Sequence, residues 1–408
     1  MNHRAPAFLC GMACLLCLLV PVMAATSPLW TVQGEKYGEL AGVVISDDGS
    51  TILTGGHQII SLDPEGRTRW EGWSAGPLAV SGDGDYILSA QGQVLRLISA
   101  AGSLTWEKSM DIAVTDIAIT ENASLIAATG GGRTRLLDLQ GEGIALNITL
   151  AVNHIRILPP DQIVITSARG VQISNRTLLP VWTDYGFAQD LIEVSPVRAT
   201  FVTATDDRVR LYDRTGSLLF DQKFNNGNAR CLAISRDGST IVTGTDRNQI
   251  LAINRDGSLL WRKSAGGWIT GVAVSDDGDT IVAGAMDSKM YVYDRAGALL
   301  GTFTARTPVP PRSVGVSHDG SLILLVDDTA IYAFSRASFA GAAPTVTETP
   351  AETPSETPTE TAQTTRPLPA VTFLTFTPIP TGTEETPINP AVPLAALGIL
   401  VLFRPRKP

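Results

Sequence analysis

The chain has 408 residues, of which 44% are hydrophobic and 17% are charged, and its formal net charge is −9. This length predicts several domains or one large repetitive domain, and the composition excludes a wholly disordered or coiled-coil protein. The acidic balance argues against a nucleic-acid partner, which would require a concentrated basic surface.

Residues 1–24 are typical of a secretory signal peptide. Arg4 gives the basic start, an apolar stretch follows, and the small residues before Ala24 suit a signal peptidase, so we expect cleavage there. An uncleaved N-terminal anchor is the alternative. A lipoprotein built on Cys14 is less favoured, because much of the apolar run follows that cysteine. Beyond this leader Cys231 is the only cysteine in the sequence, so neither a disulfide scaffold nor a zinc site is expected.

One sequence pattern then recurs roughly every 40 residues, eight times in all, and the clearest copies are Gly271–Gly301 and Cys231–Trp261. Each copy contains four short apolar runs separated by Asp, Gly and Ser, which is typical of strands joined in hairpins. Four strands per copy predict an all-β protein with the architecture of a β-propeller.

The ends of the array predict how the ring closes. The last copy lacks a fourth strand, whereas Ser27–Trp30 is a spare strand of the kind that is missing. We therefore expect Leu29–Val32 to pair with the strand around Ile331–Phe334, which gives an eight-bladed β-propeller over residues 27–339. Seven blades remain the alternative if the irregular copy at His154–Trp182 is not a blade.

Two known repeat types resemble these copies. Gly271–Leu300 resembles a WD40 repeat, with Ser-x-Asp-Gly after the inner strand and Tyr-Asp in place of Trp-Asp. Asp63–Trp70, Asn254–Trp261 and Asp213–Phe220 resemble the Asp…Gly…Trp signature of quinoprotein (PQQ-like) repeats, with a turn that is one residue shorter. The resemblance implies a propeller fold but little about activity, because propellers host unrelated functions.

Several conspicuous residues are explained by this fold. The tryptophans at one fixed repeat position predict packing between blades, and they are Trp30, Trp70, Trp106, Trp182 and Trp261. The Asp-Gly pairs predict hairpin turns, since they lack the alternating Asp and the final Glu of a calcium-binding EF-hand loop. Cys231 is expected to act as a small buried hydrophobe.

We predict no catalytic, cofactor or metal site. Zinc-protease and phosphate-loop motifs are absent from the sequence, and the histidines of the repeats lack ligand spacing. The repeats are nearly minimal, which leaves little chain to cover a cofactor. A PQQ-type quinoprotein or another propeller enzyme is the alternative.

The loops that lead into the inner strands predict a binding site at one mouth of the ring. Trp73 and Trp268 stand in Gly-rich loops, off the repeated tryptophan position, and we expect Arg312 and Tyr37 to lie between them. Aromatic faces with a guanidinium suit a glycan, a peptide or an envelope protein. Packing within the loops is the alternative role for both tryptophans.

The C-terminal region predicts a tether. Residues 342–386 are rich in Thr, Pro and Glu, which favours a solvated, disordered stalk. Residues 387–408 combine a short apolar run with a basic end, and together with the stalk they resemble the anchoring tails of archaeal and some bacterial surface proteins.

We therefore expect an exported protein, anchored in the membrane, that acts at the cell surface as a binding or scaffolding module. The stalk argues against a periplasmic assembly scaffold. Asn122, Asn147 and Asn175 begin sequons and are candidates for glycosylation.

Overall fold

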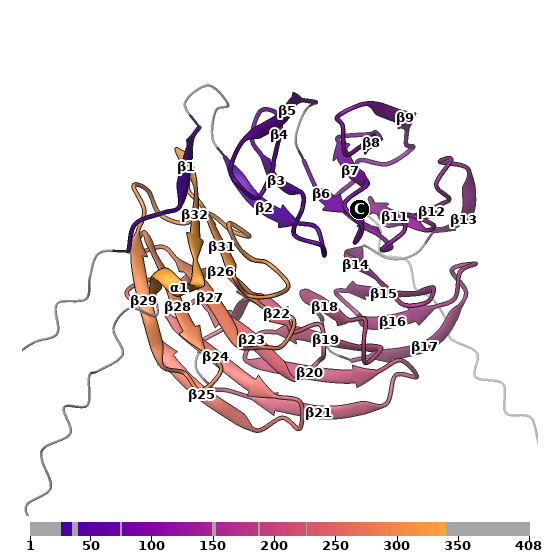
Figure 1. The fold of residues 1–408 in the computed structure, drawn as a ribbon. Coiled ribbons are helices and arrows are strands. Elements are labelled where there is room, and N and C mark those ends of the chain that lie inside the picture. Colours follow the sequence, from indigo (N-terminus) through magenta and orange to yellow (C-terminus); the bar gives the residue numbers. More distant parts are fainter. Residues whose placement is uncertain are drawn as a thin grey trace, which may run out of the picture. The chain divides into compact units, whose positions relative to one another are not determined.

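The computed structural model describes residues 26–34, 40–73, 76–148, 152–186, 188–225 and 227–339. Within them, strands form eight four-stranded antiparallel sheets that surround a common axis (Figure 1). The predicted all-β, eight-bladed propeller is confirmed, and the irregular copy at His154–Trp182 is a complete blade. The predicted leader, stalk and anchor lie outside the described residues. Among the residues described, no helix is long and apolar enough to cross a membrane.

Each blade uses its four strands in the same order from the axis outward. The inner strands are β2 (Ala41–Ile45), β6 (Leu78–Val80), β10 (Asp116–Ile119), β14 (Val152–Leu158), β18 (Leu191–Ser195), β22 (Ala229–Ile234), β26 (Ile269–Val274) and β30 (Val314–Val316). The second strands are β3 (Ile52–Gly55), β7 (Tyr86–Gln91), β11 (Ile126–Gly130), β15 (Gln162–Ser167), β19 (Thr200–Thr205), β23 (Thr240–Thr245), β27 (Thr280–Ala285) and β31 (Leu322–Val326).

The two outer positions complete the sheets. The third strands are β4 (Ile59–Leu62), β8 (Val94–Ser99), β12 (Arg133–Leu137), β16 (Gly170–Ser174), β20 (Arg208–Asp213), β24 (Gln249–Asn254), β28 (Lys289–Asp294) and β32 (Ala330–Ser335). The outer strands are β5 (Thr68–Gly72), β9 (Leu104–Ser109), β13 (Gly143–Ile148), β17 (Pro180–Tyr185), β21 (Leu218–Lys223), β25 (Leu259–Ser264), β29 (Leu299–Thr304) and β1 (Trp30–Gln33). We number the blades 1 to 8 from the blade that begins with β2.

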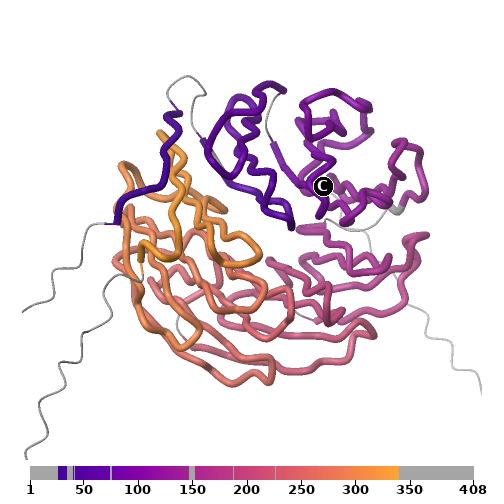
Figure 2. Tube along the Cα trace, in the orientation of Figure 1, coloured from indigo at the N-terminus to yellow at the C-terminus, as the bar shows by residue number. Residues whose placement is uncertain are grey.

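The N-terminal strand β1 closes the ring by completing blade 8. Trp30 pairs with Ala333 and Val32 with Ile331, and the Leu29 amide donates to the Ala333 carbonyl at 2.7 Å. Figure 2 shows the two ends of the described chain lying side by side in this blade. The predicted closure is confirmed, down to the residues that pair.

Neighbouring blades are joined through an aromatic residue on one outer strand and a turn in the next blade. The indole nitrogen of Trp70 donates to the Ala100 carbonyl at 2.8 Å, and that of Trp261 donates to the Arg295 carbonyl at 2.9 Å. A Cβ atom added to Gly297 would lie 2.7 Å from the Trp261 ring. The repeated tryptophans therefore pack between blades, as the sequence predicts, and the glycine in each turn leaves room for the ring.

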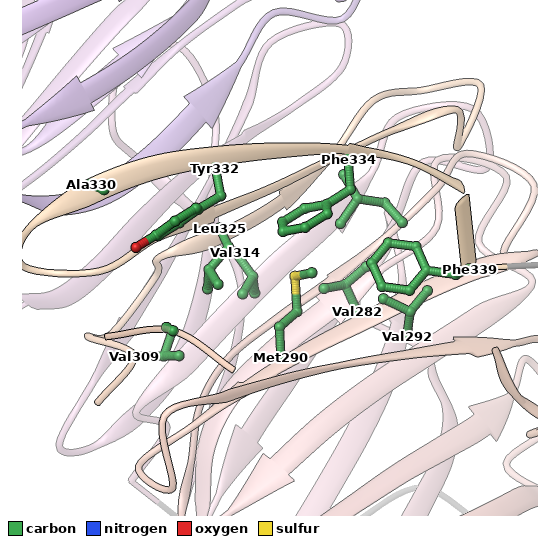
Figure 3. Packing of buried hydrophobic residues seen from close by; sticks show 12 residues of the cluster. Val282, Met290, Val292, Val309, Val314, Leu325, Ala330, Tyr332, Phe334 and Phe339 are labelled. Atoms are coloured by element: carbon green, nitrogen blue, oxygen red, sulfur yellow. The ribbon is translucent and has the colours of Figure 1, made fainter. Parts of the chain in front are cut away.

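The second and third strands supply the core between blades. Between blades 7 and 8, Met290 and Val292 of β28 face Phe334 of β32 (Figure 3). The short helix α1 (Arg336–Phe339) follows β32 and places Phe339 against the Phe334 ring, with centroids 5.5 Å apart. These buried apolar residues stabilise the blade contact that lies next to the closure.

The Asp-Gly pairs form hairpin turns after the inner strands, as predicted. In blade 7 the Ser275 hydroxyl donates to the Asp277 carboxylate at 2.6 Å and accepts from the Thr280 amide at 2.9 Å. Equivalent serines make the same pair of bonds in blades 1, 2, 6 and 8. The residue between this Ser and Asp differs from blade to blade and lies at the end of the inner strand.

Candidate functional site

The inner strands surround hollows at both ends of the axis. A hollow of about 500 Å³ lies toward the starts of these strands, at what we call the proximal mouth. A second hollow of about 370 Å³ lies toward their ends, at the distal mouth. Both volumes fall within the range of small-molecule pockets, so the two mouths are the natural candidate sites.

A paired arginine lies in the wall of the proximal hollow. Arg156 of β14 donates to the Glu193 carboxylate of β18 at 2.9 and 3.2 Å and to the Asp116 carboxylate of β10 at 3.2 Å. Burial alone would lower the pKa of Arg156, but Glu193 and Asp116 outweigh it and raise the pKa. Asp116 also accepts from the Ile155 amide at 2.9 Å, so this group ties blades 3, 4 and 5 together.

Two further arginines at the proximal mouth have no partner among the residues that the structure describes. Arg230 of blade 6 and Arg312 before blade 8 both line the hollow, and each lies five residues before the Ser of its Ser-x-Asp-Gly turn. Both are exposed, and within the described residues neither guanidinium has a hydrogen-bonding partner or an ion pair. They are therefore available to an anionic ligand.

The backbone fixes Arg312 in place. Its φ is 59°, a left-handed conformation that is strained for a residue with a side chain. Its carbonyl accepts from the Val43 amide at 2.9 Å, and the neighbouring Ser313 hydroxyl accepts from the Gly42 amide at 3.2 Å. Blade 8 and blade 1 thus hold this residue at the edge of the hollow.

The distal mouth is crossed by a network of charged side chains. Arg236 of blade 6 forms ion pairs with Asp47 of blade 1 and Glu121 of blade 3. His318 of blade 8 lies 3.1 Å from Asp47 and 2.7 Å from Asp276 of blade 7. Five blades on different sides of the axis therefore meet here, and the charges at this end are matched to one another.

The pKa values of this distal network follow its contacts. Burial tends to lower the pKa of His318, but the hydrogen bond that its ring donates to Asp47 and the charges of Asp47 and Asp276 raise it overall. Burial tends to raise the pKa of Asp47, but His318 and Arg236 lower it overall. For Asp276, burial is the largest influence and raises the pKa, and repulsion from Asp47 adds to it. His318 therefore holds its proton more strongly than an ordinary histidine.

The three predicted site residues that the structure describes lie in different surroundings. Trp73 is half-buried between blades 1 and 2, where its indole donates to the Gly102 carbonyl at 3.3 Å and lies beneath Arg96. Trp73 therefore belongs to blade packing, the alternative that the sequence left open. Trp268 is 57% exposed and lines a separate hollow, which shares no residue with the proximal one. Of the four predicted residues, Arg312 lines the proximal hollow and Tyr37 lies outside the described residues.

The sequons occupy different settings. Asn122 is exposed in a turn after β10, and Asn175 accepts three hydrogen bonds within its own turn. Asn147 belongs to β13. Glycosylation at all three stays a prediction.

Sequence reasoning missed both charged groups, although a signal for the distal one exists. The charged residues of this network share one repeat position, directly after the recurring Ser or Thr at the end of an inner strand. They are Asp47, Glu121, Arg236, Asp276 and His318. Because inner strands run parallel around the axis, residues at one repeat position form one ring. Comparing that position across repeats predicts a polar ring, whereas reading each repeat alone shows only isolated charges.

Comparison with known proteins supports the repeat assignment. Residues 205–366 match the family described as outer membrane protein assembly factor BamB, which is built from PQQ-like repeats. This chain is similar to the PQQ-like propellers. Among curated proteins, none matches it. The similarity is to a propeller family that includes enzymes and non-enzymes, so it leaves the activity open.

The PQQ-like similarity raises the question of whether the proximal hollow fits a calcium-held quinone. Calcium requires several free oxygen ligands. The Glu193 carboxylate in the wall accepts both hydrogen bonds from Arg156, and Asp116 behind it is engaged by Arg156, His154 and the Ile155 amide. Within the described residues no group of three or more acidic, His or Cys side chains could hold a metal ion. The residues of this hollow therefore do not fit that cofactor.

Proposed function

We propose that this PQQ-like propeller is a binding module at the cell surface, tethered by its C-terminal region, and that its proximal mouth receives an acidic segment of an envelope or extracellular protein. The observation that carries the proposal is a pair of guanidiniums on the rim of the proximal hollow, those of Arg230 and Arg312, for which the described residues supply no partner. Planar guanidiniums favour carboxylates because they can bind both oxygens at once.

The contrast between neighbouring arginines supports an external ligand. Arg156 in the same wall already binds two carboxylates of its own chain, whereas Arg230 and Arg312 bind none within the described residues. The chain as a whole is acidic, with a net charge of −9. Two cations beside one hollow, without partners among the described residues, would direct an acidic ligand to this mouth.

A peptide-binding experiment tests the proposal on the full-length protein. A synthetic Asp/Glu-rich peptide should bind, more weakly as salt increases, whereas a Lys-rich peptide of equal length should not. Arg312→Gly is the decisive variant, because glycine removes the guanidinium and also relieves the left-handed backbone. We expect it to weaken peptide binding about tenfold while leaving the melting temperature unchanged or higher.

Arg230→Gln should weaken binding in the same direction, and Arg214→Gln, an exposed arginine in the turn between β20 and β21, is the matched control. Equal affinity of the Arg312→Gly variant and the unaltered protein would contradict the proximal-mouth site. Protease treatment of intact cells tests the surface location independently: an outward-facing propeller is degraded without lysis.

The family description favours a second candidate, a scaffold for envelope assembly. That description names an outer membrane protein assembly factor, and a propeller of eight near-minimal blades in the described residues is consistent with a scaffold. Depleting the protein and measuring the abundance of envelope proteins separates the roles. A scaffold changes the abundance of many envelope proteins, whereas a surface receptor leaves them at normal levels.

A further inference from the structure

We infer that the propeller carries a second binding site, for a neutral sugar residue, in the hollow beside Trp268. This hollow measures about 490 Å³ and is lined by Asp207, Asn225, Gly227, Asn228, Asp246, Arg247 and Trp268. The lining comes from turns and loops of blades 5, 6 and 7. It shares no residue with the hollow at the proximal mouth, so the inference does not depend on the proposed peptide site.

Trp268 differs from the tryptophans that join the blades. Its side chain is 57% exposed, whereas Trp261 of the neighbouring outer strand is 8% exposed and donates its indole proton to the next blade. Within the described residues the Trp268 indole has neither a hydrogen bond nor a ring contact. A large apolar face left open beside a hollow suits a ligand with an apolar face of its own.

Backbone contacts on both sides of Trp268 fix the loop that carries its indole. The Gly266 amide donates to the Asp287 carboxylate at 3.0 Å and to the Tyr291 hydroxyl at 3.1 Å. A Cβ atom on Gly267 would lie 2.6 Å from the Asp287 amide nitrogen, so only glycine permits this close approach. On the other side, the Trp268 carbonyl accepts from the Met286 amide at 2.9 Å and Ile269 is fully buried. The base of Trp268 is therefore fixed, which keeps the cost of ordering it on binding low.

The polar side of the hollow offers both donors and acceptors. Asp246 accepts from the backbone amide and the side-chain amide of Asn228, at 2.8 and 3.0 Å, and its oxygens have further acceptor capacity. Asp207 is paired with Lys223 at 3.3 Å. Arg247 is exposed, and no side-chain partner is found for it in the described part of the chain.

Charge decides the ligand class. The Asp207 carboxylate is paired with Lys223, and the Asp246 carboxylate lines the hollow together with Arg247. The hollow therefore has neither the excess of positive charge that would bind an anion nor the cluster of free carboxylates that would bind a cation. Hydroxyl groups can donate to the carboxylates and accept from Arg247 and the asparagine amides. A sugar ring combines such hydroxyls with an apolar C–H face that can lie on the indole. A neutral hexose or N-acetylhexosamine at the end of a glycan fits these conditions.

The test uses the full-length protein and a panel of neutral and anionic saccharides, with saturation-transfer NMR to detect binding and calorimetry to measure affinity. We expect a neutral saccharide to bind with little change between about 50 and 500 mM salt, since no net charge is neutralised. Trp268→Ala should weaken binding about tenfold or more, and Trp268→Phe should retain part of the affinity. Tyr185→Ala, which removes an aromatic residue that is 52% exposed on blade 4, is the matched control.

Three results would overturn the inference. They are no neutral saccharide bound at millimolar concentration, equal affinity in the Trp268→Ala variant, or binding of anionic saccharides alone that is lost with Arg247→Gln and high salt. Arg312→Gly should leave saccharide binding unchanged, whereas Trp268→Ala should leave peptide binding unchanged. The two variants thereby distinguish an error in the proposed saccharide site from an error in the proposed peptide site.

Discussion

The indole nitrogen of Trp30 donates to the Pro64 carbonyl at 2.9 Å, which joins the strand that completes blade 8 to the turn between β4 and β5 in blade 1. The same N-terminal strand therefore closes the ring twice. Its backbone pairs with β32, and its tryptophan packs against the following blade, as Trp70 and Trp261 do elsewhere.

Replacing Trp30 with alanine should destabilise the whole ring. The change removes the Pro64 hydrogen bond and leaves a cavity over Gly66, and we expect a loss of about 3 kcal/mol in the free energy of unfolding. Leu29→Ala is the control, because Leu29 is 59% exposed and bonds to β32 through its backbone only. Chemical denaturation of both variants checks the prediction, and equal midpoints would contradict a closing role for Trp30.

The turn glycines should differ sharply in their tolerance of alanine. Gly297 has a φ of 85°, and an added Cβ would lie 2.7 Å from the Trp261 ring. Gly92 also has a positive φ, of 56°, but nothing lies within 4 Å of its added Cβ. Gly92→Ala should therefore cost about 1 kcal/mol from backbone strain alone.

Gly297→Ala adds overpacking to that strain and should cost roughly 2–4 kcal/mol. Thermal melts of the two variants isolate the packing contribution, since the backbone contribution is shared. Similar melting temperatures would show that the Trp261 ring moves aside easily and that the blade contact is loosely packed.

Much of the fold was predictable because its determinants are local and repeated. Runs of Val, Ile and Leu between Asp-Gly turns indicate the second and third strands, which are buried on both faces. The outer strands were harder to delimit. In blade 7 the apolar run ends at Leu300, but β29 continues to Thr304. Most side chains of this outer strand are exposed or half-buried, so its last residues need not be apolar. Periodicity over so few residues does not show where such a strand ends.

The site was predicted only in part, because it depends on distances across the axis. Arg312 lines the proximal hollow and Trp73 packs between blades, but the sequence around each residue does not distinguish these two settings. The pairing of Arg236 with Asp47 joins residues far apart in the chain, and no local pattern indicates which blades face each other. Comparison of equivalent positions in the repeats would have located the ring of charges but not its partners.

Removing only the arginine of the Arg156–Asp116 ion pair, which lies at the wall of the proximal hollow, should strongly destabilise the protein. Arg156→Met removes the guanidinium from Asp116, whose side chain is only 6% exposed, and leaves it with His154 and the Ile155 amide. We expect a loss of about 3–5 kcal/mol, because an unpaired buried charge is strongly destabilising. Adding Asp116→Asn to Arg156→Met should recover part of the loss by removing that charge, which urea denaturation of the single and double variants can measure. A double variant less stable than the single one would contradict the assignment.

The distal network should make stability depend on pH through His318. The contacts with Asp47 and Asp276 raise the pKa of His318 above 6.5, so the folded protein binds this proton more tightly than the unfolded chain does. The resulting stabilisation is fully present below pH 6.5 and is lost as the pH rises through the raised pKa. The pKa of Asp47 is lowered by His318 and Arg236, so its own titration lies well below this range.

We therefore expect the melting temperature to fall as the pH is raised from about 6 to about 9, and the His318→Gln variant to show a smaller fall. NMR titration of the His318 ring gives the pKa directly and should place it above 6.5. Asp276→Asn removes one of the two carboxylates and should lower that pKa, while the Asp47 contact at 3.1 Å preserves part of the elevation. If the melting temperatures of the unaltered protein and the His318→Gln variant ran parallel over the whole range, the protonated histidine would not be what holds blades 1, 7 and 8 together at the distal mouth.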